Sequence, residues 1–146
     1  MFVGVDIIEN ERMAKAMARR PRLLDRVFTR QEREYCLSKA NPARHFAARF
    51  AAKEAVGKAL GRGVPSWQEI EVTSSAGGRP QVRISGGAEA AALAAGTGTI
   101  SLSISHTDFA SIAVAVINRI ADAGRWTQDP GLNQKPKPNP KIKPKN

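Results

Sequence analysis

The chain has 146 residues, which is enough for one domain with a hydrophobic core and too few for two ordinary domains. Hydrophobic residues make up 42% of it, but no apolar run approaches the roughly 18 residues that a membrane span needs, so the composition excludes a membrane-spanning protein. The formal net charge of +10 predicts an anionic partner, and nucleic acid, an anionic cofactor and an acidic protein all meet that condition.

Two features indicate a cytoplasmic location. The N-terminal run MFVGVD has neither the basic segment nor the small-residue cleavage site of a secretory signal. The single cysteine, Cys36, cannot form an intramolecular disulfide, so a reduced compartment suits the protein. We interpret Cys36 as a small residue of a helix.

The first predicted element is a short buried strand, FVGVDI, in which apolar residues lead up to Asp6. A lone acid at that position usually marks the exit of a strand into solvent. From about Asn10 the segment ERMAKAMARR has the composition of a helix, which Pro21 ends.

Two further helices carry recognisable start signals. Thr29 followed by Glu32 fits a capping box and predicts a short helix that runs to about Lys39. Asn41 followed by a proline predicts the N-terminus of a longer helix that runs to Leu60. The glycine after Leu60 is the expected C-terminal stop.

The sequence of the second half of the domain predicts mostly strands. The stretches 67–74 and 80–84 are expected to pair through the turn sequence Ala76-Gly77-Gly78. Residues 88–95 are rich in alanine and predict a helix. The stretches 99–105 and 109–118 predict a second strand pair, joined around His106, so the fold class is α+β.

Residues 119–146 differ in composition from the rest of the chain. They hold seven Lys or Arg against two Asp, and their last part alternates Pro with Lys and has no apolar periodicity. We therefore expect a domain over residues 1–118 and a disordered or extended tail over 119–146. A flexible solubilising tail, a cloning or frameshift remnant and an extra anionic contact are all compatible with this segment.

The long helix carries two neighbouring polar stripes. Spacing places Phe50, Glu54 and Lys58 on one stripe, and Arg49 and Lys53 on the next. Taken alone, Glu54 and Lys58 indicate a surface ion pair worth a few tenths of a kcal/mol. Neither this stripe nor Asp6 identifies a function by itself.

Together, five ordered segments resemble the holo-acyl-carrier-protein synthases, the small bacterial branch of the phosphopantetheinyl transferases. They cover about residues 1–118 and are GVDIIE at the N-terminus, FTRQE near residue 30, RFAAKEAVGKALGRG, WQEIEV and SLSISHT. The resemblance implies transfer of the phosphopantetheine arm of coenzyme A to a serine of an apo acyl carrier protein of fatty-acid synthesis.

The resemblance also implies a metal site. Asp6 and Glu54 match the two Mg²⁺ ligands of the family, and Mg²⁺ is typically held by one or two carboxylates, waters and substrate phosphates. Glu54, directly or through a metal-held water, is the expected base for the serine proton, with 3′,5′-ADP as the leaving group.

For the coenzyme, the resemblance implies contacts from Lys58 to the phosphates and from His106 to the nucleotide part. It assigns Arg49 and Lys53 to the coenzyme too, although their side chains could instead lie over apolar neighbours. His106 has the alternative of a turn histidine that bonds the backbone. His45 has no motif, and we expect a structural role for it.

Protein partners follow from the same resemblance. Residues 12–33 carry eight Arg or Lys, and Arg12 and Arg22 best match the surface on which the family docks the acidic helix of the carrier protein. The family implies a homotrimer with coenzyme sites between protomers, for which residues 112–117, IAVAVI, are the candidate contact.

The alternative from another class is a basic nucleic-acid-binding module, which the charge and the Lys/Pro tail favour. Against it, aromatic residues make up 5% of the chain and Tyr35 is the only tyrosine. A platform for stacking bases is therefore missing, and we expect no nucleic-acid partner.

Overall fold

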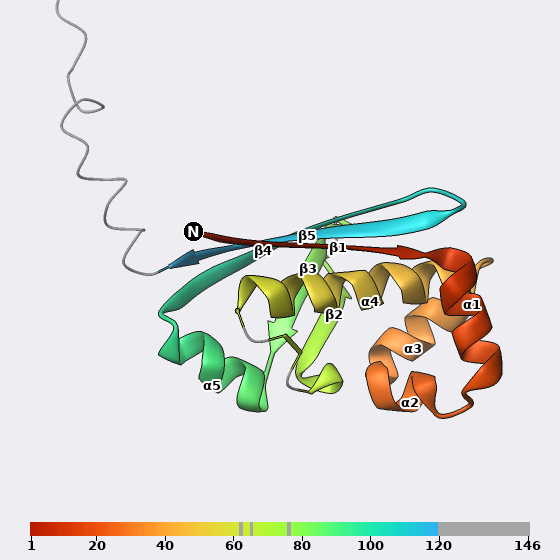
Figure 1. Ribbon diagram of the computed structural model, residues 1–146, viewed down its shortest axis with the longest axis horizontal. Helices are drawn as coiled ribbons and strands as arrows, with labels where there is room; N and C mark the ends of the chain where they lie inside the picture. Colours follow the sequence, from red (N-terminus) through yellow and green to blue (C-terminus); the bar gives the residue numbers. More distant parts are fainter. Residues whose placement is uncertain (62, 65, 76, 120–146) are drawn as a thin grey trace, which may run out of the picture.

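The computed structural model describes residues 1–61, 63–64, 66–75 and 77–119. Its helices all lie on one side of a three-stranded antiparallel sheet (Figure 1), which confirms the predicted α+β class. The predicted tail beyond residue 119 lies outside the described residues and stays a prediction. Within the described part of the chain, no helix combines the length and apolar character needed to cross a membrane.

The sheet joins the two ends of the domain. Strand β1 (Phe2–Glu9) pairs with β5 (Ala110–Arg119), which pairs in turn with β4 (Thr97–His106), so the strand order is β1-β5-β4. The β4–β5 hairpin confirms the predicted second strand pair. In the register, Asp6 of β1 lies opposite Ala113 of β5, and Ala113 also lies opposite Ile104 of β4.

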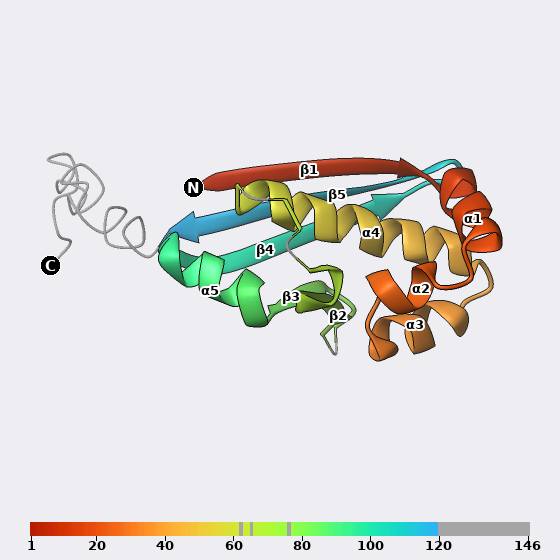
Figure 2. The ribbon, with the colours of Figure 1, turned by 60° about the horizontal axis from the view of Figure 1, so that its bottom comes forward.

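Helix α4 (Pro42–Ala59) packs along the inner face of the sheet (Figure 2). It begins as predicted, because the Asn41 side chain accepts a hydrogen bond from the Arg44 backbone N–H at 3.2 Å. Alanines at every fourth position are buried, and their small side chains let the helix lie close to the strands: Ala47, Ala51, Ala55 and Ala59.

Three shorter helices cover the end of α4: α1 (Asn10–Arg19), α2 (Leu23–Val27) and α3 (Arg30–Leu37). The capping box of Thr29 and Glu32 is confirmed in both directions. Helix α2 was not predicted. It is a single turn with no side-chain cap, so its formation depends on tertiary packing of Val27 rather than on a local signal.

A second, two-stranded sheet lies beside α4. Strands β2 (Ile70–Ser74) and β3 (Pro80–Ile84) pair as predicted. The prediction that the first of these strands starts at Trp67 is wrong, because Trp67–Glu69 form a 3₁₀ turn, η1, before it. Helix α5 (Gly86–Ala94) begins two residues earlier than predicted, and the Glu69 carboxylate accepts a hydrogen bond from the backbone N–H of Ala88 in its first turn.

The outer face of the three-stranded sheet is not covered by any described residue (Figure 1). On β1, Val3, Val5 and Ile7 point to this face and are 58%, 50% and 65% exposed. Ile112 of β5 lies opposite Ile7 in the register and is 37% exposed. The sheet therefore presents a continuous apolar surface on this side.

Candidate active site

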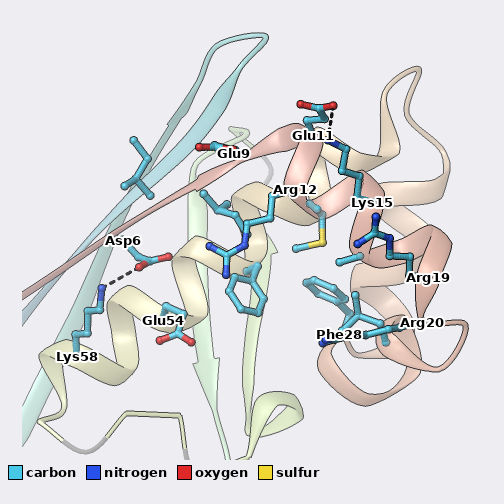
Figure 3. A pocket seen from close by; sticks show the side chains of 16 residues that line it. Asp6, Glu9, Glu11, Arg12, Lys15, Arg19, Arg20, Phe28, Glu54 and Lys58 are labelled. Atoms are coloured by element: carbon cyan, nitrogen blue, oxygen red, sulfur yellow. Dashed lines mark hydrogen bonds and ion pairs between the residues drawn. The ribbon is translucent and has the colours of Figure 1, made fainter.

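A close contact between β1 and α4 sets the geometry of the site. A Cβ atom at Gly4 would lie 2.0 Å from the carbonyl oxygen of Ala55, so any other residue there would push the helix off the strand. Side chains alternate along a strand, so Asp6 faces α4 as Gly4 does. Its carboxylate therefore meets the helix on which Glu54 and Lys58 lie (Figure 3).

The Lys58 ammonium donates hydrogen bonds to the Asp6 carboxylate at 2.8 Å and to the Val5 carbonyl at 3.0 Å. Two carboxylates lie near Lys58 among the described residues, Asp6 on the adjacent strand and Glu54 one turn earlier in the helix. Lys58 forms its ion pair with Asp6. The Asp6 side chain is 18% exposed and that of Lys58 is 50% exposed. The ammonium is therefore accessible to an anion from solvent.

Glu54 shares this space with a second negative charge. Burial raises the pKa of Glu54, the charge of Asp6 raises it further, and Lys58 lowers it in part. Two carboxylates held near each other in a partly buried site attract a cation, and their oxygens suit Mg²⁺. No group of three or more His, Cys, Asp or Glu capable of holding a metal occurs in the described part of the chain, so a cation here would take its other ligands from water or substrate.

A pocket of about 780 Å³ extends from these charges along α1. Its walls include the apolar side chains of Met13, Phe28 and Phe50. Arg12 reaches from α1 into this space, and further basic side chains of α1 line the far end (Figure 3). One hollow thus combines paired carboxylates, an accessible ammonium and an arginine rim.

A second pocket, of about 660 Å³, adjoins the first and shares Arg20, Leu23 and Phe50 with it. Arg22 lines this second pocket. Phe50 stacks on Trp67 there, with ring centroids 4.9 Å apart. Both arginines predicted for docking therefore border adjoining pockets, Arg12 the first and Arg22 the second.

The other predicted coenzyme residues gather elsewhere, at the N-terminal half of α4. The rings of His45 and His106 are in edge contact, with centroids 5.9 Å apart. The Arg49 guanidinium lies 4.0 Å from the centroid of the Tyr35 ring, and the Lys39 ammonium lies 4.4 Å from it. Arg49 is 6% exposed, and its buried Nε has no hydrogen-bond partner.

The charged residues Asp6, Glu54 and Lys58 form one cluster, and the residues around His45 and Arg49 form a second. The two clusters lie on opposite sides of α4. At about 100° per residue, the nine positions from His45 to Glu54 turn the helix through about half a circle. The strand order supports the same separation of the clusters, because Asp6 is on β1 and His106 is on β4, and these strands are the two edges of the sheet. One coenzyme molecule would have to cross the helix to touch both clusters within one protomer.

Lys53 occupies neither cluster. Its side chain is completely buried, and the ammonium contacts the Glu32 carboxylate at 2.8 Å and the Trp67 carbonyl at 2.7 Å. The same carboxylate accepts a hydrogen bond from the Val72 backbone N–H at 2.8 Å. Because its charge is already compensated inside the protein, we leave Lys53 out of the coenzyme contacts.

Comparison with known proteins identifies the family of this chain. A sequence model of the 4′-phosphopantetheinyl transferase superfamily matches residues 2–117. The holo-acyl-carrier-protein synthase of Caldanaerobacter subterraneus subsp. tengcongensis is 48% identical over 120 residues, which cover 80% of this chain and 94% of the relative.

Solved structures show the same fold. The synthase of Neisseria meningitidis matches with a TM-score of 0.74 and 28% identity, covering 81% of this chain and 98% of that one. The synthase of Helicobacter pylori, solved in complex with coenzyme A, matches with a TM-score of 0.70 and 29% identity, covering 80% of this chain and 99% of that one.

The chain therefore belongs to the 4′-phosphopantetheinyl transferase superfamily. Within it, the chain is an enzyme of the holo-acyl-carrier-protein synthase type. The alternative of a nucleic-acid-binding module is set aside on this finding.

Sequence reasoning missed several residues that shape the site. The sequence placed Gly4 in a strand without giving it a role, and only the close packing of α4 shows why this residue must be small. The contact of His45 with His106 joins residues 61 positions apart and had no signal in the sequence beyond their shared residue type. Asn10 was interpreted as a helix start, but it also binds the β4–β5 turn.

Proposed function

We propose that this chain transfers the 4′-phosphopantetheine arm of coenzyme A to a serine of an apo acyl carrier protein of fatty-acid synthesis, with one Mg²⁺, in the cytoplasm. The observation that carries the proposal is the meeting of Asp6, Glu54 and Lys58 at the head of a pocket with a basic rim. Incubation with apo carrier protein, coenzyme A and Mg²⁺ should add the mass of one phosphopantetheine. A carrier protein of unchanged mass after prolonged incubation would reject the proposal.

In this mechanism the carboxylates of Asp6 and Glu54 would hold the Mg²⁺. When bound, the ion would neutralise charge on the pyrophosphate of the coenzyme. The negative charge of Asp6 helps to raise the pKa of Glu54, and a cation at this position would relieve that repulsion.

The chain itself supplies a base and an electrostatic clamp. Glu54 accepts the proton of the attacking serine hydroxyl as the new P–O bond forms on the β-phosphate and the bond to the 3′,5′-ADP leaving group breaks. Lys58, half exposed beside Asp6, donates to the phosphates.

A homotrimer with the coenzyme between protomers accounts for the split of the coenzyme residues. Lys58 lies on one side of α4, while Arg49 and His106 lie on the other, so neighbouring protomers would each contribute one half of the site. The uncovered apolar face of the sheet, including Ile112, supports an association of this kind. A monomer of about 16 kDa in light scattering that retained full activity would contradict it.

The carrier protein is proposed to dock on α1 and α2. Arg12 and Arg22 would contact acidic side chains of the carrier, and the Phe50–Trp67 stack, which lines the same pocket as Arg22, offers an apolar contact. Arg12 and the base Glu54 border the same pocket, which would bring a serine of a protein docked there toward the carboxylate.

A further inference from the structure

Asn10, the first residue of α1, binds the turn between β4 and β5. Its backbone N–H donates to the Phe109 carbonyl at 2.8 Å. Its side-chain amide nitrogen donates to the carbonyls of Thr107 at 2.9 Å and of Asp108 at 3.1 Å. One residue thus holds three consecutive peptide units that lie about 100 positions away in the sequence.

The other side-chain atom of Asn10 is satisfied as well. Its amide oxygen accepts a hydrogen bond from the Ser111 hydroxyl at 2.8 Å, and Ser111 is completely buried. Asn10 itself is 5% exposed. Both donors and the acceptor of this buried amide therefore have partners, which requires asparagine and not aspartate, because a carboxylate has no N–H to donate.

The turn has little else to anchor it. Thr107 closes it internally, accepting from the Phe109 and Ala110 N–H groups through its hydroxyl. The Phe109 side chain at the tip is 84% exposed, and the ion pair of Asp108 with Arg44 is long, at 3.4 Å. The contacts with Asn10 are consequently the main link between the turn and the helices.

The turn begins directly after His106. His106 lies opposite Ser111 in the β4–β5 register, and its ring contacts His45 of α4. If the turn shifted relative to α1, the His106 imidazole would move relative to the side of α4 that carries His45 and Arg49. The position of the coenzyme contact therefore depends on the Asn10 amide.

We propose that Asn10 is a positioning residue for coenzyme binding, acting through the β4–β5 turn on His106. The inference rests on the proposed coenzyme contact of His106. Asn10→Asp keeps the size of the side chain, removes both donors and brings a negative charge against two carbonyl oxygens. It should therefore release the turn without removing any hydrogen bond of Asp6 or Lys58.

The test is steady-state kinetics of the full chain with each substrate varied in turn. Asn10→Asp should raise the KM for coenzyme A about fivefold, as expected for a lost contact of about 1 kcal/mol. The carrier KM and kcat should stay within about twofold of wild type, because Met13 packs α1 into the core independently of the turn. Asn41→Asp is the matched control, since the cap of α4 needs only a side-chain oxygen and should leave all three constants unchanged.

A double mutant separates positioning from a general structural role. If Asn10 acts through His106, Asn10→Asp combined with His106→Ala should bind coenzyme A no worse than His106→Ala alone. Additive effects would overturn the proposal, as would equal losses for both substrates together with a lower melting temperature. Should the aspartate variant fail to fold, Asn10→Ser removes the same donors without adding charge, and the same outcomes apply to it.

The proposed coenzyme contact of His106 and the proposed positioning role of Asn10 can be rejected separately. If His106→Ala raises the KM for coenzyme A but neither Asn10 variant does, positioning by Asn10 is wrong and the contact of His106 stands. If His106→Ala leaves that KM unchanged, the proposed contact itself is wrong, and the role of Asn10 falls with it.

Discussion

Two lysines on α4, five positions apart, each lie 2.8 Å from a carboxylate. Lys53 points into the protein and pairs with Glu32, and both side chains are completely buried. Lys58 points into the pocket and pairs with Asp6 while half of its side chain stays exposed. The same ion-pair distance thus occurs in two very different environments.

The two environments shift the pKa of the two ammonium groups in opposite directions. Burial lowers the pKa of Lys53, and the charge of Glu32 offsets that effect in part. The hydrogen bond with Asp6 raises the pKa of Lys58. A buried charge that loses its partner is strongly destabilising, whereas an exposed one is solvated by water. We infer that the first pair maintains the fold and that the second remains available to a substrate phosphate.

The largest effect should come from breaking the buried pair. Glu32→Ala should leave the Lys53 ammonium buried without its carboxylate and lower the free energy of unfolding by about 3–5 kcal/mol. Lys58→Ala is the matched control, because it breaks the exposed pair and should cost less than about 1 kcal/mol. Urea unfolding followed by circular dichroism measures both. Similar losses in the two variants would show that burial does not separate the pairs.

The next effect concerns activity rather than folding. Asp6→Ala and Glu54→Ala should each lower turnover by about 100-fold or more, since each removes a proposed Mg²⁺ ligand and Glu54 also the base. Both variants should also show a weaker dependence of rate on Mg²⁺, and their melting temperatures should stay close to wild type. Glu34→Ala is the control, because Glu34 forms only an exposed pair with Arg30. Near wild-type turnover in both site variants would contradict the proposed metal site.

A smaller effect should separate the two substrates. Charge reversal at Arg12 or Arg22 should raise the KM for the carrier protein several-fold and spare that for coenzyme A, whereas Lys58→Ala should do the opposite. The arginine effects should shrink at high salt, where the Debye length falls below about 8 Å. Steady-state kinetics at two ionic strengths measures this. If the arginine variants weakened coenzyme A and spared the carrier, the two basic surfaces would be assigned the wrong way round.

The sequence predicted most elements because their signals are local. The capping box at Thr29 and the Asn41 cap each depend on neighbouring residues, and both were confirmed. The pairing of β2 with β3 was confirmed as well, whereas the predicted turn between them includes Ala76, which lies outside the described residues. The pairing of β1 with β5 depends on contacts across the whole chain, which no local pattern encodes. Helix α2 was missed for the same reason, since it has no cap of its own.

The candidate site was predicted mainly through family resemblance. The structure brings Asp6, Glu54 and Lys58 together, but spacing along α4 could not separate Lys53 from Lys58, because the partner that buries Lys53 comes from α3. Likewise, Arg49 and His106 were assigned to the same coenzyme as Lys58, and only the position of α4 across the sheet shows that they lie on the other side of the helix.

The smallest effect concerns a third basic residue of α4, His45, which is neither fully buried nor paired with an acid. Burial lowers its pKa below the usual 6.5, and the nearby charges of Arg44, Arg49, His106 and Lys39 lower it further. The unfolded chain therefore binds a proton at this site more readily than the folded chain does. Stability should be complete above about pH 6.5 and should fall as the pH drops below it.

His45→Gln removes this titration while keeping a polar side chain of similar length. Melting temperatures measured between about pH 7.5 and about pH 5.5 should fall further for the wild type than for His45→Gln. The difference should be small, because the ring is only partly buried and solvent screens the surrounding charges. Parallel pH profiles for the two proteins would show that the cluster around His45 does not disfavour its protonation. His45 would then resemble Lys58, a cation that solvent stabilises, and not a charge disfavoured by burial.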